Sequence, residues 1–160
     1  MAQTFGNKNN QIMNWDDFKT RYGISRTTNF DLMDIAKDLQ LKVKVVMHNE
    51  LLKIPKTTKY VIMNLDSSKN AGTHWVAIFN TPDYKLYFSS FGDPPSDNVI
   101  KFMNKTTTKT TVREYSDFLI QEFDTEYCGQ ISLFVLMCLN KGISADEVVL
   151  DLKTAAMPSK

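Results

Sequence analysis

The chain has 160 residues, of which 42% are hydrophobic and 23% charged, the composition of one ordinary globular domain. This composition excludes a wholly disordered chain, a collagen-like repeat and a disulfide scaffold, and the net charge of +1 gives no global basic field for nucleic acid or an anionic membrane. No run approaches the roughly 18 apolar residues of a membrane span, and the polar start MAQTFGNKNN lacks the apolar centre of a signal peptide.

Two helices are predicted near the N-terminus. Asn14 can cap a short helix over 15–22 that ends before Gly23, and Thr28 or Asn29 can cap a second helix. In the second segment apolar residues recur at helical spacing. They are Phe30, Leu32, Met33, Ile35, Ala36 and Leu39.

The middle of the chain changes to the pattern of strands. Val43–Met47 and Lys59–Leu65 are predicted strands, and the second reads as buried because it contains YVIMNL. His74–Phe79 and Tyr84–Phe88 are predicted to form a hairpin through the segment NTPD, with Pro82 as the turn residue.

The C-terminal part returns to helices after a turn at FGDPP. A helix is predicted over 96–104, an extended segment over 112–120 and an apolar helix over 128–140. A Ser-x-x-Glu capping box starts a last helix over 144–152. Helices, then mostly strands, then helices predict an α+β fold with a meander-like sheet and a central buried helix.

The two cysteines do not suggest a disulfide. Cys128 and Cys138 lie ten residues apart in one predicted helix, a rise of about 15 Å that no disulfide can bridge. This favours a reducing compartment. The spacing of the two cysteines with His48, which we expect in a loop, and His74 fits no zinc module. No metal or cofactor is therefore expected.

Cys128 stands where a thiol can become reactive. It follows a polar run and opens the apolar helix, and a helix N-terminus carries partial positive charge that lowers a thiol pKa. The adjacent amides could donate to an oxyanion. The alternative is a structural cysteine at the start of a core helix, because free cysteine is among the most buried residue types.

Two further residues could complete such a site. His74 begins a strand, where an imidazole could serve as general base for the thiol, or it could be an ordinary surface histidine. Gln121 lies seven residues before Cys128, where its amide could donate to an oxyanion, or it could simply be solvated.

Together these segments resemble adenain-like viral maturation cysteine proteases, which are related to SUMO-specific proteases. The matching pieces are YVIMNLDSSKNAGTHWVAIF, YFSSFGDPP and QEFDTEYCGQISLFVL. Their order and spacing agree from Asp34 to Leu152. The residues of these motifs are most similar to those in proteases of virophages and Maverick/Polinton elements. The resemblance implies a small papain-like α+β fold, a mixed sheet packed on a central helix that starts at Cys128.

The resemblance also implies a role for each matching residue. Cys128 is the nucleophile and His74 the base that takes its proton. Gln121 donates to the oxyanion together with the backbone amides of Cys128 and Gly129. Trp75 forms a wall of the substrate groove.

The chain departs from this family at Ser89, where the family commonly has an acid. Such an acid fixes the imidazole tautomer and stabilises imidazolium. Three explanations stay open. A Cys–His dyad could be oriented by Ser89, Asp93 or Asp83 could supply the acid, or the domain could be a weak or inactive relative.

The function implied is a cysteine endopeptidase that matures viral or virus-like capsid or other structural polyproteins, cutting after small residues or glycine. The alternatives are deconjugation of a ubiquitin-like modifier and peptide binding with little catalysis. The partners implied are a polypeptide substrate and, as in some relatives, an activating peptide or DNA, with no membrane. The location implied is the virion and the host cytoplasm or viral factory.

We expect residues 1–160 to form a single protease domain. Residues 1–30 lie outside the resemblance. They could be a docking arm, an activation segment or ordinary packing.

Overall fold

A five-stranded mixed sheet organises the chain. The computed structural model describes residues 13–23, 27–66, 74–116 and 127–156. The strands are neighbours in chain order: β1 (Val43–Met47), β2 (Tyr60–Asn64), β3 (Trp75–Asn80), β4 (Tyr84–Phe88) and β5 (Val112–Tyr115). The outer pairs β1–β2 and β4–β5 are parallel, and β2, β3 and β4 form an antiparallel meander.

This strand direction brings distant segments to one edge of the sheet. The C-terminal ends of β1, β2, β4 and β5 meet there with the N-terminal end of β3. We call this the His74 edge, because His74 immediately precedes β3.

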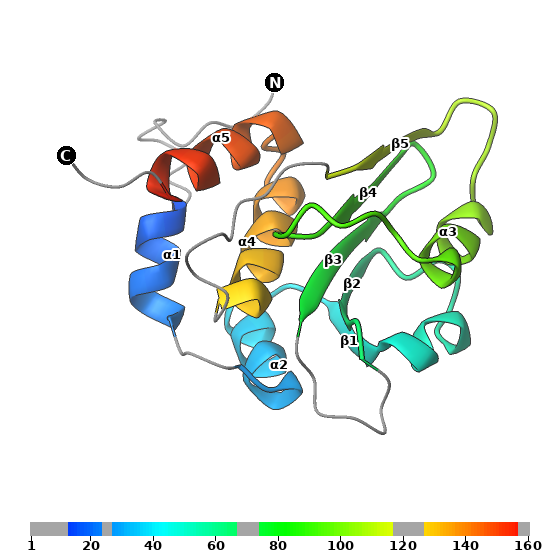
Figure 1. The fold of residues 1–160 in the computed structure, drawn as a ribbon. Coiled ribbons are helices and arrows are strands. Elements are labelled where there is room, and N and C mark those ends of the chain that lie inside the picture. Colours follow the sequence, from blue (N-terminus) through cyan, green and yellow to red (C-terminus); the bar gives the residue numbers. More distant parts are fainter. Residues whose placement is uncertain (1–12, 24–26, 67–73, 117–126, 157–160) are drawn as a thin grey trace.

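Helices cover both faces of the sheet (Figure 1). One face carries α1 (Trp15–Tyr22), α2 (Asn29–Asp38), α4 (Cys128–Asn140) and α5 (Ala145–Ala156). The other carries a 3-10 helix, η2 (His48–Lys53), and α3 (Asp97–Asn104). The predicted α+β fold, with a mixed sheet against a central helix that starts at Cys128, is confirmed.

Side-chain alternation along the strands makes two cores. On β2, Tyr60 and Ile62 face the α4 side, while Val61 and Met63 face η2 and α3. The helix α4 is buried from Cys128 to Cys138 because β3 packs on one side of it and α1, α2 and α5 pack around it. This explains why its sequence is apolar nearly all round.

The described part of the N-terminal segment belongs to the larger core. Trp15 and Phe18 of α1 are buried, and both rings meet Phe134 of α4 edge-on at centroid distances of 5.6 and 5.5 Å. Of the three roles left open for residues 1–30, ordinary packing fits these residues of α1.

The structure corrects the expectation for His48. We expected a loop residue, but His48 begins η2. The Glu50 side chain accepts a hydrogen bond from the Met47 amide at 2.8 Å, and the buried Leu51 anchors the helix to the second core. Such a short helix depends on tertiary packing and leaves little periodic pattern in the sequence.

Two predicted elements differ from the structure by more than one residue at a boundary. β5 ends at Tyr115, and residues 117–120 of the predicted extended segment lie outside the described residues. The last helix continues to Ala156 rather than ending at Leu152, since no helix breaker intervenes. In the part of the chain that the structure describes, no helix has the length and apolar character needed to cross a bilayer.

Truncating Phe134 should be far more costly than truncating an exposed phenylalanine. Phe134 is fully buried, whereas the Phe30 side chain is 70% exposed on α2. We expect Phe134→Ala to lower the free energy of unfolding by about 3–5 kcal/mol and Phe30→Ala to change it by no more than about 0.5 kcal/mol. Urea unfolding followed by tryptophan fluorescence measures both, and similar losses would contradict this core assignment.

Candidate active site

The first residue of α4 and the start of β3 meet at the His74 edge. The His74 carbonyl accepts a hydrogen bond from the Leu65 amide at 2.9 Å, so the next amide, that of Trp75, points to the opposite side, toward β4. The β3–β4 ladder begins only at the Ala77–Phe88 pair. The Trp75 amide instead donates to the Cys128 sulfur at 3.4 Å.

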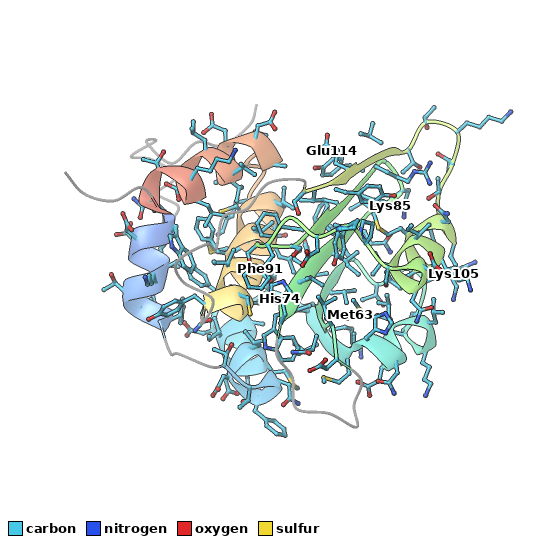
Figure 2. The ribbon with its side chains drawn as sticks, in the orientation of Figure 1. Met63, His74, Lys85, Phe91, Lys105 and Glu114 are labelled. Carbon is cyan, nitrogen blue, oxygen red and sulfur yellow. The ribbon has the colours of Figure 1, made fainter. Side chains whose placement is uncertain are left out.

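His74 is held by a hydrogen bond and by ring stacking. Its Nε2 lies 3.1 Å from Ser89 Oγ, just after β4, and its ring stacks on Phe91 with a centroid distance of 4.2 Å. Figure 2 shows His74 and Phe91 side by side at the first turn of α4. The other ring nitrogen, Nδ1, is buried and has no hydrogen-bond partner. The ring therefore keeps one nitrogen available for chemistry.

Burial sets the charge of this histidine. The His74 side chain is only 6% exposed, and desolvation lowers its pKa to about 4, against an opposing effect of the Asp93 charge. At neutral pH the imidazole is therefore uncharged, which is the form that can accept a proton.

The thiol is also held uncharged. Burial raises the Cys128 pKa, although the backbone amides of Trp75, Gly129 and Cys128 itself act in the opposite direction. The amides at the helix N-terminus act in the predicted direction, but desolvation outweighs them and the net shift of the Cys128 pKa is upward. At rest both the Cys128 thiol and the His74 imidazole are therefore neutral.

Two residues given roles by the resemblance, Trp75 and Gly129, are buried. Trp75 is 5% exposed, and its indole nitrogen donates to the Thr27 carbonyl at 3.3 Å. A Cβ on Gly129 would lie 2.5 Å from Thr27 Oγ1 and 2.9 Å from Leu32 Cδ2. The indole thus packs in the larger core, and Gly129 lets α4 approach α2 closely. A role for Trp75 at the substrate groove stays a prediction.

The structure separates the two alternative acids. Asp83 lies in the β3–β4 turn at the edge of the sheet opposite His74, so it cannot orient this imidazole. Asp93 acts on His74 through its charge. Gln121 lies outside the described residues.

Other residues bear on the site to different degrees. His48 pairs with Ser96 Oγ at 3.2 Å. Ser132 was missed by the sequence analysis: its hydroxyl lies 2.8 Å from the Cys128 carbonyl and 3.3 Å from the Trp75 carbonyl. A buried serine one helical turn after the cysteine was the available signal. Among the described residues, no three His, Cys, Asp or Glu side chains converge as metal ligands would.

Replacing His74 should reduce the change of the free energy of unfolding with pH below neutrality. The unfolded histidine takes up its proton near pH 6.5, but folded His74 does so only near pH 4. Between these values the unfolded state binds more protons, so stability falls as pH falls, by at most about 1.4 kcal/mol per pH unit. We expect His74→Gln to lose this component and His48→Gln to retain it, in urea unfolding measured from pH 4.5 to 7.5. Equal slopes for all three proteins would contradict the burial argument.

The sequence matches no protein-family model. It is similar to the cysteine protease S273R of African swine fever virus (isolate Tick/Malawi/Lil 20-1/1983), with 30% identity over 124 residues that cover 67% of this chain and 43% of that protein. This chain therefore spans less than half the length of the viral relative.

Solved structures give the same match. The selenomethionine crystal structure of the African swine fever virus pS273R protease superposes with a TM-score of 0.57 and 17% identity over 82% of this chain and 66% of that one. A second crystal structure of the pS273R protease gives a TM-score of 0.54 and 18% identity over 81% and 65%. The chain thus has the fold of this viral cysteine protease, as the resemblance to adenain-like and SUMO-specific proteases predicted.

Proposed function

We propose that this chain is a cysteine endopeptidase domain that cleaves viral polyproteins through a thioester on Cys128. The observation that carries the proposal is the junction of β3 with α4. There the Trp75 amide contacts the Cys128 sulfur, while His74, the preceding residue, has its Nδ1 unpartnered and its Nε2 on Ser89. The similarity to a viral cysteine protease supports this chemistry.

In the proposed reaction two protons pass through His74: the thiol proton goes to the leaving amine, and a proton from water later restores the thiol. His74 Nδ1 takes the thiol proton as the Cys128 sulfur bonds to the scissile carbonyl carbon. The carbon–nitrogen bond then breaks, and His74 returns the proton to the leaving amine. Water attacks the thioester with His74 as base, the carbon–sulfur bond breaks and the thiol is restored. The backbone amides of Cys128 and Gly129, with the Gln121 side chain, donate to the oxyanion.

In the neutral resting pair His74 is unprotonated but a weak base, so the proton transfer depends on the groups that favour the charged forms. Because the His74 pKa is about 4, the base is ready at every pH above that value. The amides that oppose the rise of the Cys128 pKa already point to the sulfur, so charge that develops there meets fixed donors.

In this proposal two residues share the role of the acid that orients the histidine in the family. Ser89 supplies the hydrogen bond to Nε2, and Asp93 supplies negative charge that favours imidazolium. Of the three explanations left open by the sequence, this arrangement favours a dyad oriented by Ser89, with Asp93 as an electrostatic aid.

The substrate is proposed to be a capsid or other structural polyprotein, cut after small residues. Cys128 is only 5% exposed, so a slim, glycine-like acyl segment reaches the sulfur most easily. An activating peptide or DNA stays part of the proposal, as does a location in the viral factory or virion. With a net charge of +1, any DNA binding should show a shallow salt dependence.

Replacing Cys128 should remove cleavage, whereas replacing the other cysteine should not. We expect the parent chain and Cys138→Ala to cut a fluorogenic peptide with Gly-Gly before the scissile bond, and Cys128→Ala to give no product. A matched peptide with Leu-Leu at those positions should be cut at least about tenfold more slowly, because the buried sulfur excludes bulky acyl residues.

A Gly-Gly peptide with a C-terminal vinyl ester should in parallel add one peptide mass to Cys128. Absence of both cleavage and adduct formation in the parent would overturn the proposal. Stable peptide binding without either reaction would identify a binding domain, and cleavage of only a ubiquitin-like fusion would move the substrate class to a modifier.

The division of roles between Ser89 and Asp93 predicts opposite shifts of the His74 pKa. Ser89→Asp should raise it from about 4 by placing a carboxylate at Nε2, and Asp93→Asn should lower it further by removing negative charge. Nuclear magnetic resonance (NMR) titration of the His74 ring measures both. We also expect Ser89→Ala to reduce kcat about tenfold or more. A silent Ser89→Ala together with an inactive Asp93→Ala would refute this assignment.

A further inference from the structure

Ser116 joins the end of β5 to the residue that holds His74. The last backbone bond between β4 and β5 runs from the Ser116 amide to the Tyr87 carbonyl at 2.9 Å. Beyond this bond the Ser116 hydroxyl, and not the backbone, links the two segments. Its Oγ accepts a hydrogen bond from the Ser89 amide at 2.8 Å and donates one to the Ser89 carbonyl at 3.1 Å.

The direction of each hydrogen bond follows from the groups involved. An amide can only donate, so the Ser116 oxygen must accept from Ser89 and its single proton is free for the Ser89 carbonyl. One hydroxyl thus satisfies both backbone polar groups of one residue. Ser89 is fully buried and Ser116 nearly so. Water therefore cannot readily replace these hydrogen bonds.

The fixed backbone of Ser89 places its side chain. Ser89 Oγ lies 3.1 Å from His74 Nε2 and also accepts from the Phe91 amide at 3.3 Å. The Gly92 amide donates to the Ser89 carbonyl at 2.9 Å, which closes the turn that brings Phe91 onto the imidazole. A shift of the Ser89 backbone would therefore move both the hydrogen-bond partner and the stacking partner of His74.

We propose that Ser116 is a positioning residue: through Ser89 it holds His74 in the tautomer with the proton on Nε2 and with Nδ1 free to accept. The inference rests on the proposed function for its catalytic consequence but not for its structural one. A serine hydroxyl can either donate to or accept from an imidazole, unlike the carboxylate common in the family. The tautomer therefore depends on the direction of the hydrogen bond between Ser89 Oγ and Nε2, which the fixed Ser89 backbone and the Phe91 amide on the same oxygen help to set.

The experiment compares Ser116→Ala, which removes the hydroxyl, with Ser116→Thr, which keeps it. The matched control is Thr111→Val at the other end of β5, where the Thr111 hydroxyl bonds the Pro82 carbonyl at 2.6 Å, far from His74 along the strand. Nitrogen-15 NMR of the His74 ring reports the tautomer without any need for activity, and peptide cleavage gives kcat and KM separately.

We expect Ser116→Ala to convert a single Nε2-protonated form of His74 into a mixture and to lower kcat about 10- to 100-fold, with KM changed less than about twofold. Ser116→Thr should restore most of both properties, and Thr111→Val should leave both unchanged. An unaltered tautomer and kcat in folded Ser116→Ala would overturn the inference while leaving the protease proposal intact. An altered tautomer in a chain that cleaves nothing, even as the parent, would support the positioning role and refute the proposed function.

Discussion

The contact of the Trp75 amide with the Cys128 sulfur fixes the arrangement of the site. It exists because β4 pairs with β3 only from Ala77 onward, which leaves the Trp75 amide unused by the sheet. The first turn of α4 occupies that space, and the Ser132 hydroxyl shares its single proton between the carbonyls of Cys128 and Trp75. The thiol and the imidazole are thereby placed by backbone geometry, and the side chains around them adjust only the details.

Packing of α4 is the larger constraint behind this contact. The helix is surrounded by β3, α1, α2 and α5, and it approaches α2 closely because Gly129 has no side chain to strike Thr27 or Leu32. A helix buried on all sides cannot shift along its axis without opening cavities. The position of its first residue, Cys128, is therefore set by the core as a whole.

The same burial determines the electrostatics. Desolvation lowers the pKa of His74 and raises that of Cys128, so both groups are neutral at rest. Three backbone amides and the charge of Asp93 act in the opposite direction, but each is weaker than the loss of water. The polar groups around the site are fixed amides and two serines: the Ser116 hydroxyl bonds the Ser89 backbone, and the Ser89 hydroxyl bonds His74.

Local sequence patterns determined most of the secondary structure. The helices 15–22 and 128–140 and the strands 43–47 and 84–88 were predicted to the residue, because caps, breakers and apolar periodicity are local signals. The ordered motifs around His74 and Cys128 also determined the likeness to a cysteine protease. The 3-10 helix at His48 escaped prediction because it depends on Leu51 reaching a distant core.

Only the tertiary structure decided how the site residues relate to one another. The sequence left Ser89, Asp93 and Asp83 as alternatives, and strand direction settled the matter for Asp83 by placing it at the opposite edge. Tertiary packing also buried Trp75 and Gly129, and the resulting desolvation made the net pKa shift of Cys128 an upward one. Burial and hydrogen bonding between strands far apart in the chain are non-local properties. A sequence can therefore nominate Cys128, His74 and Ser89, but the fold decides their charge and their partners.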